Sequence, residues 1–261
     1  MNFLVVSAAS LAAIVVVFGV TFAISRRINR ANVVDVAWGL GFVAVAAVAA
    51  VLGDGDPTRR ILLLALVSIW GLRLAIHIHS KTAGKGEDPR YRALLREDYS
   101  ARNVLRRVYL IQGVSAWFVS LPLQVSAIAG PTPRALWPVA AVGLALWVVG
   151  VVFEALGDHQ LKKFKADPAN KGRIMDRGLW AWTRHPNYFG DASVWWGIWL
   201  ITITGPLSLL TVFSPALMTY FLVYATGARL AEKFMAGRPG FDEYCSRTSF
   251  FVPRPPKSVA R

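Results

Sequence analysis

Apolar residues occur along this chain in long uncharged runs separated by polar segments, and the length of the runs predicts membrane-crossing helices. A hydrocarbon core of about 30 Å needs about 20 helical residues. Residues 61–80 predict one such helix, which contains Arg73. The other runs cover residues 3–24, 36–53, 108–133 and 135–153, with a longer run at 192–228 that predicts two helices joined by a turn at Gly205-Pro206. The pattern therefore predicts an all-α integral membrane protein with about seven transmembrane helices, folded as one domain over residues 1–261.

The composition agrees with this class and refines the topology. Apolar residues make up 55% of the chain and the mean hydropathy is +0.44, which excludes a soluble domain of this length. The net charge is +14, and most Lys and Arg residues lie in segments 25–30, 80–107, 158–187 and 228–261. The positive-inside rule predicts that these segments are cytoplasmic, so that the N-terminus lies outside and the C-terminus inside. Because the basic residues adjoin membrane helices, we expect a membrane rather than a nucleic acid as the partner.

Cysteine and histidine usage limits the chemistry. The single cysteine, Cys245, excludes an intrachain disulfide and a multi-cysteine metal site. The four histidines have no ligand spacing on one helix, so no metal is predicted. The candidate chemistry therefore lies in polar side chains at the ends of the apolar runs.

Asp35 is the first of these side chains, at the start of the run 36–53. A carboxylate at or just below the membrane interface costs a few kcal/mol unless it is partnered or protonated. One interpretation is an acid favoured by the positive end of a helix dipole. The other is a pocket residue that donates a hydrogen bond or a proton, with Trp38 beside it as a substrate contact.

A second candidate group follows the run 61–80. Arg73, His77 and Ser80 fall at i, i+4 and i+7, so they share one stripe of a helix. Arg73 keeps its charge and needs an anion, for which Asp35 and a bound phosphate are both candidates. His77 is either structural or catalytic. The glycines that flank Lys85 leave open a phosphate site in the next loop.

The third group stands at the end of the run 135–153. Glu154, Asp158, Lys162 and Lys165 recur at helical spacing. A solvated ladder of i, i+4 ion pairs is one interpretation. Because Glu154 and Asp158 leave the membrane together beside cations, a site for a ribose and a phosphate is the other.

The fourth group is the polar segment 184–191 and the apolar helix that follows it. One stripe of the predicted helix carries residues at i, i+4, i+8 and i+12, namely Asn187, Asp191, Trp195 and Trp199. The stripe is polar at the start of the helix and aromatic farther along it. An interfacial aromatic belt would place tryptophans near the helix end. Trp195 and Trp199 lie two turns or more inside, which favours a pocket.

These motifs together resemble the bacterial DUF1295 branch of the steroid 5-alpha-reductase family. The resemblance rests on four segments: Asp-Val-Ala-Trp-Gly at 35–39, Gly-Lys-Gly-Glu-Asp-Pro-Arg-Tyr at 84–91, Arg-His-Pro-Asn-Tyr-Phe-Gly-Asp at 184–191 followed by Trp-Trp-Gly, and the tail at 238–253. It implies a seven-helix enzyme of the bacterial inner membrane that holds NADPH at its cytoplasmic end. The implied reaction reduces an activated carbon–carbon double bond in a lipid or steroid-like substrate.

The resemblance also implies roles for individual residues. Asn187 and Asp191 match positions that contact the nicotinamide, and Asp158 matches an acidic cofactor contact. Further cofactor contacts are implied in the Arg-His-Pro-Asn-Tyr motif and at basic positions for the phosphates, namely Arg184, His185, Tyr188, Lys165, Arg177 and Arg229.

The substrate end departs from the steroid enzymes. Only Asp35 stands roughly where they carry a Gln-Glu pair, and a region with Arg73 and His77 replaces their substrate-facing tyrosine. We therefore expect Asp35, together with His77, to polarise a carbonyl or supply a proton. Arg73, Trp38, Trp195 and Trp199 are the expected substrate contacts.

Two other functions stay open at this point. Membrane methyltransferases of the isoprenylcysteine carboxyl type share the Arg-His-Pro-x-Tyr segment and use S-adenosylmethionine, which needs fewer cationic partners than NADPH. A non-catalytic lipid-binding or transport protein is the third reading, although no inverted repeat supports it. The oligomeric state is not predicted.

Overall fold

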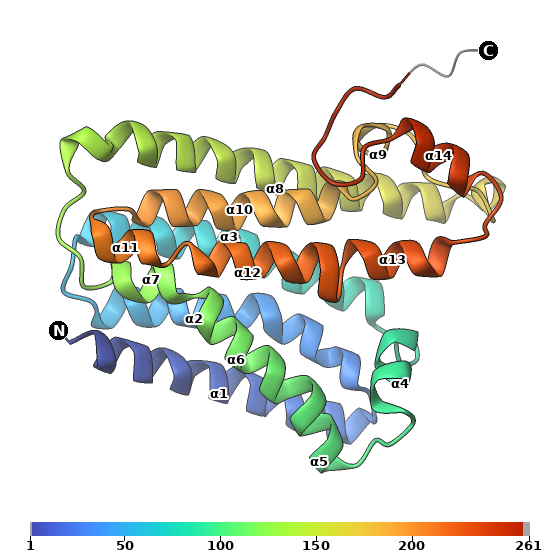
Figure 1. Cartoon of the computed structure of the whole chain (residues 1–261). Helices are drawn as coiled ribbons and strands as arrows, with labels where there is room; N and C mark the ends of the chain where they lie inside the picture. The colour runs from blue at the N-terminus through green and yellow to red at the C-terminus, as the bar shows by residue number, and fades with distance from the viewer. Residues whose placement is uncertain (1, 258–261) are drawn as a thin grey trace. The chain divides into compact units, whose positions relative to one another are not determined.

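The computed structural model describes residues 2–257, and within them the chain is helical apart from one isolated bridge between Thr183 and Ser249. Figure 1 shows helices of very different length along the chain. The chain divides into two compact units. Unit 1 comprises Met1–Trp137 and Thr202–Ser214, and unit 2 comprises Pro138–Ile201 and Pro215–Arg261.

Unit 1 is built on three long helices. They are α1 (Phe3–Ile28), α2 (Val34–Leu52), which the 3-10 turn η1 (Ala31–Val33) precedes, and α3 (Pro57–Thr82). Helix α2 packs against both α1 and α3. Its approach to α3 is close because Gly39 faces Gly71, where a Cβ atom on Gly71 would lie 2.7 Å from the Gly39 carbonyl oxygen. Phe42 and Trp70 fill the space beside this contact, with ring centroids 5.7 Å apart.

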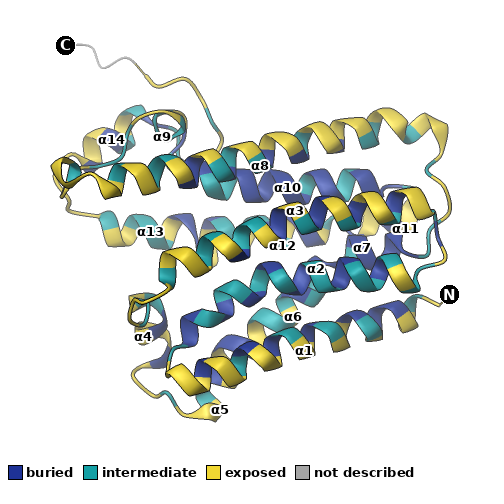
Figure 2. Ribbon diagram, turned by 180° about the vertical axis from the view of Figure 1, so that it is seen from behind, coloured by how far each residue is buried: buried dark blue, intermediate teal, exposed yellow. Residues whose placement is uncertain are grey.

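Shorter helices complete unit 1. A continuous helix over residues 101–119 consists of α5 (Ala101–Val104), a π-helical turn η2 (Leu105–Tyr109) and α6 (Leu110–Val119). The others are α4 (Pro89–Leu95), α7 (Leu121–Ser126), η3 (Arg134–Leu136) and α11 (Pro206–Leu210). Figure 2 shows the buried faces of these helices turned toward one another and the exposed faces turned outward.

Unit 2 is organised around a close contact between α8 (Trp137–Ala166) and α10 (Pro186–Thr202). Three glycines of α8 recur every seven residues along the contact, at positions 143, 150 and 157. A Cβ atom on Gly150 would lie 2.6 Å from the Gly190 carbonyl oxygen, and one on Gly143 would lie 2.7 Å from the Gly197 carbonyl oxygen. The missing side chains therefore let the two backbones approach, which brings the end of α8 beside the start of α10.

Unit 2 also contains several shorter helices. They are η4 (Pro168–Asn170), α9 (Leu179–Trp182), α12 (Phe213–Tyr220), the π-helical turn η5 (Phe221–Ala225), α13 (Ala228–Met235) and α14 (Phe241–Arg247). Gly227 joins η5 to α13 and has a Leu222 backbone carbonyl where a Cβ atom would stand. This position therefore admits only glycine without a backbone shift.

Within the part of the chain that the structure describes, five helical segments are long and apolar enough to cross a membrane. They are Phe3–Ile28, Ala31–Leu52, Pro57–Thr82, Arg134–Ala166 and Pro206–Met235. The predicted run 108–133 is instead divided at Ser120 between α6 and α7, and the break predicted at Gly205-Pro206 lies between α10 and α11. The membrane class is thus supported, while a count of seven spans and the orientation stay predictions.

Candidate functional site

Asp35 lies in unit 1 at the centre of a group of polar side chains, the Asp35 cluster, formed with Arg90, Tyr91 and Gln112. The Tyr91 hydroxyl donates a hydrogen bond to Asp35 Oδ1. Gln112 Nε2 donates to the Tyr91 hydroxyl oxygen over 3.0 Å. Arg90 Nη2 lies 3.5 Å from Asp35 Oδ2. The carboxylate that the sequence singled out therefore has a phenol on one oxygen and a guanidinium at the other.

The loop before α4 is anchored to the start of α2 by its acidic residues. The Glu87 carboxylate accepts hydrogen bonds from the backbone N–H groups of Ala31 and Asn32, the latter over 3.1 Å. Asp88 caps α4 by accepting from the Arg90 N–H over 2.8 Å and also binds the Arg90 guanidinium at 2.9 Å. The acidic residues of segment 84–91 are therefore bound to the protein's own backbone, beside the candidate phosphate site at Lys85.

Charge and burial set the protonation of this cluster. Burial raises the pKa of Tyr91 well above its ordinary value, and the nearby Asp35 carboxylate raises it further. Burial also acts to raise the pKa of Asp88, but the hydrogen bonds from Arg90 outweigh it and hold that pKa below its ordinary value. Near neutral pH, Tyr91 is therefore a protonated donor and Asp88 is ionised.

The other predicted residues of unit 1 are Trp38 on α2 and Arg73 and His77 on α3. Trp38 is half-buried, and its ring meets Phe42 edge to face at 5.3 Å. Arg73 and His77 are half-buried on α3, and the Ser80 hydroxyl donates to the His77 carbonyl oxygen over 2.8 Å. Ser80 is thus satisfied within its own helix turn, and no role in a pocket is needed to explain it.

A second polar group lies in unit 2, the Glu232 cluster, which consists of Arg184, His185 and Glu232. Arg184 Nε lies 2.6 Å and His185 Nε2 lies 3.1 Å from the same oxygen of Glu232. The Arg184 guanidinium also donates to the carbonyl oxygens of Cys245 and Thr248, each over 3.0 Å. These contacts tie the start of α10 to α13 and to the C-terminal segment.

Aromatic rings enclose the same cluster. His185 is buried, is stacked on Tyr188 with ring centroids 5.7 Å apart, and meets Phe250 edge to face at 5.5 Å. The Arg184 guanidinium lies over the Phe250 ring at 5.3 Å. The Arg-His-Pro-Asn-Tyr motif is therefore held rigidly, partly by residues from the C-terminal segment.

Three buried acids line the contact between α8 and α10. Glu154, Asp158 and Asp191 are 3%, 8% and 7% exposed. Asn187 Nδ2 donates to Asp158 Oδ1 over 3.2 Å, which joins the two predicted cofactor residues directly. The glycine contact explains this arrangement, since a Cβ atom on Gly190 would lie 2.5 Å from the Glu154 backbone nitrogen.

A hollow of about 500 Å³ opens beside the Glu232 cluster. We call it the Arg229 hollow, and it is lined by Arg229, Glu232, Lys233, Ala236, Phe241 and Phe250. Its lining combines two cations with two aromatic rings. The Arg229 guanidinium also lies over the Tyr224 ring at 4.5 Å, so its position is fixed by stacking.

The other predicted residues of unit 2 lie in two different environments. Lys165 and Arg177 are exposed. Trp195 is completely buried, and Trp199 is half-buried against Trp196 at 5.5 Å. Trp195 therefore packs in the helical core of the unit, which is the ordinary structural role of such a residue.

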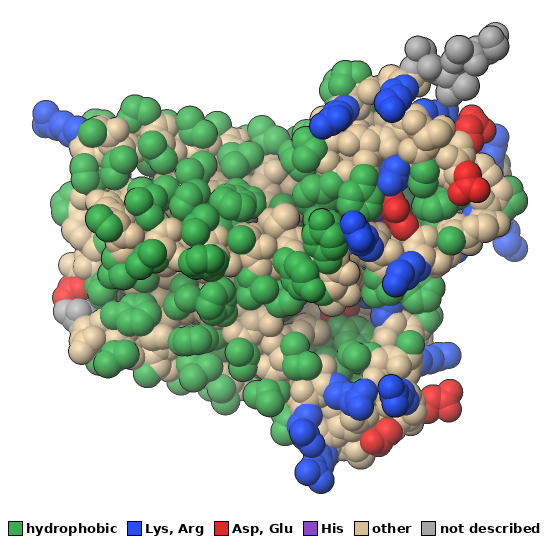
Figure 3. Space-filling model, in the orientation of Figure 1, with side chains coloured by type: hydrophobic (Ala, Val, Ile, Leu, Met, Phe, Trp, Pro, Cys, Tyr) green, Lys and Arg blue, Asp and Glu red, His purple; other side chains and the backbone are tan. Residues whose placement is uncertain are grey.

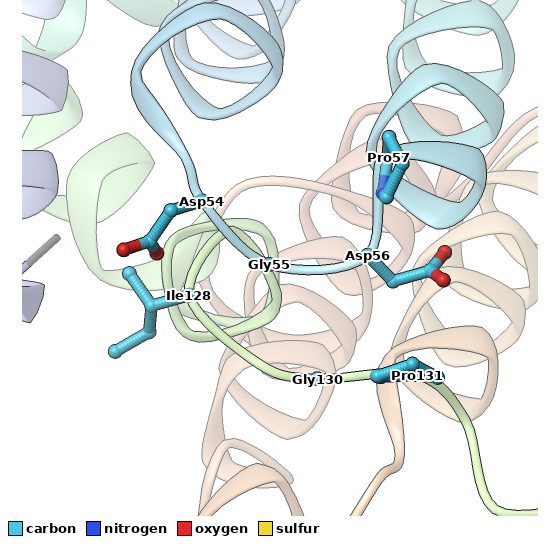
Figure 4. A pocket seen from close by; sticks show the side chains of 7 residues that line it. All are labelled: Asp54, Gly55, Asp56, Pro57, Ile128, Gly130 and Pro131. Carbon is cyan, nitrogen blue, oxygen red and sulfur yellow. The ribbon is translucent and has the colours of Figure 1, made fainter.

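A second hollow, of about 440 Å³, lies in unit 1 and is drawn in Figure 4. It contains none of the predicted site residues and is lined by Asp54, Gly55, Asp56, Pro57, Ile128, Gly130 and Pro131. Arg59 stabilises these loops from within: it is 4% exposed and donates to the carbonyl oxygens of Ala129 and Gly130 over 2.7 and 2.9 Å. We interpret this region as a structural junction.

Several residues of both clusters were not identified from the sequence. Tyr91, Arg90 and Gln112 surround Asp35, and Glu232 and Lys233 lie with Arg229 around the hollow. The available signals were a tyrosine ending the segment 84–91 and an acid flanked by cations in the short helix before the tail. Neither signal indicates its distant partner.

Comparison with known proteins gives one family and two distant relatives. The model of the family described as "Protein of unknown function (DUF1295)" matches residues 21–248. A probable O-methyltransferase, ustE of Ustilaginoidea virens, is 28% identical over 117 residues, which cover 45% of this chain and 36% of that protein. The uncharacterized protein C594.04c of Schizosaccharomyces pombe is 23% identical over 233 residues, which cover 78% of this chain and 66% of that protein. The chain thus spans less than two thirds of either relative, and no solved structure matches it.

Proposed function

We propose that this chain, which belongs to the DUF1295 family, is a membrane enzyme that binds NADPH and reduces an activated carbon–carbon double bond in a lipid or steroid-like enone. The observation that carries the proposal is the Arg229 hollow, in which Arg229 and Lys233 stand beside Phe241 and Phe250. The resemblance of the motifs to steroid 5-alpha-reductases supports the reaction class.

The lining of the hollow suits the adenosine-phosphate part of a dinucleotide. NADPH carries about four negative charges, which favour a site with more than one cation. Phe241 is buried at the edge of the hollow, and the half-buried Phe250 adds aromatic surface against which a purine ring can pack. A volume of about 500 Å³ lies in the range of small-molecule pockets but accommodates only part of a dinucleotide. We therefore assign the hollow to the phosphate and adenine end.

The Asp158–Asn187 pair is our candidate for the nicotinamide end. An amide side chain that is oriented by a carboxylate presents a fixed hydrogen-bonding edge to the carboxamide of the cofactor. The buried Asp191 lies one helical turn after Asn187 and continues the same face of α10. Arg184 and His185 act indirectly in this proposal, because they hold the segment in place through Glu232.

Within unit 1, taken by itself, the Tyr91 hydroxyl is our candidate for a group that donates to a substrate carbonyl oxygen. NADPH, when bound, supplies a hydride to the β-carbon of the enone. The negative charge that develops on the carbonyl oxygen needs a donor, and in this proposal the one hydrogen of the Tyr91 hydroxyl leaves Asp35 Oδ1, which accepts it in the structure, and turns to the substrate oxygen. Gln112 keeps its hydrogen bond to the phenol oxygen, and Asp35 together with His77 is the acid that the sequence predicts.

A specific observation favours O-methyl transfer as the second candidate function. The probable O-methyltransferase of Ustilaginoidea virens matches 45% of this chain. The three buried acids Glu154, Asp158 and Asp191 would also suit the sulfonium and ammonium groups of S-adenosylmethionine better than the phosphates of NADPH. In that case the Arg229 hollow would not be needed for cofactor binding.

Cofactor titration of the purified full chain separates these functions. We expect NADPH to quench tryptophan fluorescence saturably, and the double variant Arg229→Gln, Lys233→Gln to bind it at least about tenfold more weakly. Lys171→Gln, Arg173→Gln is the matched control, since it removes two exposed cations from elsewhere in unit 2. Saturable S-adenosylmethionine binding without NADPH binding would favour the methyltransferase, and binding of neither would favour a non-catalytic lipid-binding or transport protein.

A further inference from the structure

We propose that the first turns of the helix over residues 101–119 in unit 1 form a binding site for an anionic phospholipid. The phosphate group is bound by Arg102 and Arg106, and the acyl chains follow the outer face of α6. The inference is independent of the proposed enzymatic function, because it uses none of the residues of the Asp35 cluster or the Arg229 hollow.

The outer face of this helix changes from cationic to apolar within about two turns. Arg102 and Arg106 are exposed and one turn apart. Leu105, Leu110 and Ile111 are 46%, 58% and 56% exposed. An anionic phospholipid has the same order of groups along its length, with a charged headgroup followed by hydrocarbon. The helix therefore matches a lipid in both charge and polarity.

The two arginines are available for a ligand. Within residues 2–257, neither the Arg102 guanidinium nor the Arg106 guanidinium makes a hydrogen bond or an ion pair. By contrast, Arg184 and Arg247 of unit 2 are paired with Glu232 and Asp176. Membrane topology by itself explains why cations occur near a helix end. Here the two unpaired arginines also adjoin exposed leucines, so their charge lies at the level expected for a lipid phosphate.

Hydrogen bonds fix the start of the helix before any ligand binds. Ser100 caps α5 by accepting from the Asn103 N–H over 3.3 Å. The Asn103 side chain donates to the carbonyl oxygens of Asp98 and Leu95 over 2.7 and 3.2 Å. Arg107 donates to the Leu94 carbonyl oxygen over 3.2 Å. A site that is already ordered loses less conformational entropy on binding.

The same helix is fastened to α1, which extends the cationic surface. The Tyr109 hydroxyl donates to the Thr21 carbonyl oxygen over 3.2 Å, and the rings of Tyr109 and Phe22 are 5.1 Å apart. The α1 helix ends nearby with the exposed Arg26 and Arg27. Figure 3 shows the resulting group of Lys and Arg side chains over α4 and α5, next to green apolar surface.

Native mass spectrometry of the full chain tests the proposal. Phosphatidylglycerol and phosphatidylcholine with identical acyl chains are titrated onto the detergent-solubilised protein. We expect saturable binding of phosphatidylglycerol, and about thirtyfold weaker binding by the double variant Arg102→Gln, Arg106→Gln, from the usual contribution of each cation near an anionic lipid. Phosphatidylcholine binding should be weak and the same in both proteins.

Two further variants make the result interpretable. Lys171→Gln, Arg173→Gln removes the same charge from exposed positions of unit 2 and should bind phosphatidylglycerol normally. Arg102→Lys, Arg106→Lys should restore most of the binding, which a misfolded variant would not do. Equal binding of the two lipids, or an equal loss in the unit 2 control, would overturn the proposal. Dimers that disappear in the glutamine variant would identify the face as an interface between copies instead.

Discussion

The hydroxyl of Tyr91 donates a hydrogen bond to the carboxylate of Asp35, which joins the loop helix α4 to the first turn of α2. Burial and the nearby carboxylate keep the pKa of Tyr91 above its ordinary value. Asp35 accepts the one phenol hydrogen and Gln112 donates to the phenol oxygen, so Tyr91 donates to a ligand only when its hydrogen leaves Asp35. The pair is therefore the acidic centre of our functional proposal.

Removing this hydroxyl tests its role as the donor. We expect Tyr91→Phe to lower kcat by about 100-fold or more, the usual contribution of a positioned acid, while NADPH affinity changes by less than twofold. Steady-state kinetics and cofactor titration measure the two effects separately. Tyr99→Phe is the control, because Tyr99 is half-exposed in the same loop region. Full activity of Tyr91→Phe would transfer the role to His77 or to a bound water.

The hydrogen bonds of Glu87 predict what holds the loop before α4 against the start of α2. Its carboxylate accepts from the Ala31 and Asn32 N–H groups at the start of a helix, where a negative charge is stabilised. We expect Glu87→Gln to destabilise this contact by about 1 kcal/mol, and hydrogen exchange at Ala31, Asn32 and Asp88 to become several-fold faster. Glu97→Gln, at an exposed position, is the control. Unchanged exchange in Glu87→Gln would show that the loop is held by other contacts.

Acid should release the same loop through Asp88. Its pKa is lower in the folded chain than the ordinary value of 3.8, so its stabilising effect is complete above that ordinary value. The effect is lost as the pH falls through the lower folded value. We expect hydrogen exchange across 87–95 to accelerate as the pH falls below about 4, beyond the intrinsic chemical trend. The acceleration should be absent in Asp88→Asn, and an identical pH dependence in that variant would contradict this account.

The glycine contact between α8 and α10 predicts a steric effect on the cofactor site. A Cβ atom on Gly150 would meet backbone atoms of Gly190 and Val194 at 2.6 and 2.7 Å. We expect Gly150→Ala to destabilise unit 2 by roughly 1 to 3 kcal/mol and to weaken NADPH binding, because the helices that carry Asp158 and Asn187 move apart. Gly19→Ala, with nothing within 4 Å of the added atom, should be neutral or stabilising. Thermal unfolding measures both variants, and equal stability of Gly150→Ala and the wild-type chain would refute the packing argument.

The sequence predicted most of the helices because apolar runs report local burial directly. Residues 3–24, 36–53 and 61–80 lie inside α1, α2 and α3 or extend one residue beyond them. The run 108–133 was harder to divide into helices. One helix ends and another begins at Ser120, and no charged residue marks that break in the sequence. Uncharged residues predict membrane depth, but not where a helix breaks within it.

The hydrophobic pattern did not reveal which side chains far apart in the sequence contact each other. Asp35 was identified from its place at the start of the run 36–53, whereas its hydrogen-bond partner Tyr91 stands 56 residues away. Likewise, Arg184 and His185 were identified, but Glu232 lies 48 and 47 residues farther on. Periodicity describes one helix at a time, so it does not say which loop returns to that helix.

One long-range contact did have a signal in the sequence. Glycines at 143, 150 and 157 mark a face of α8 on which another backbone approaches. That spacing, together with Gly190 and Gly197 on α10, was not used to pair the two helices. The resemblance implied that Asp158 and Asn187 contact a cofactor, and the structure shows that they are hydrogen-bonded to each other.

Isotope transfer tests the central claim most directly. The purified chain is incubated with a bacterial lipid extract, NADPH that carries deuterium at the transferable position, and S-adenosylmethionine with a fully deuterated methyl group, and the lipids are analysed by mass spectrometry. We predict a product that gains one deuterium on carbon, and a several-fold lower yield of this product at limiting NADPH with the Arg229→Gln, Lys233→Gln variant. A product that gains a deuterated methyl group instead would contradict this claim.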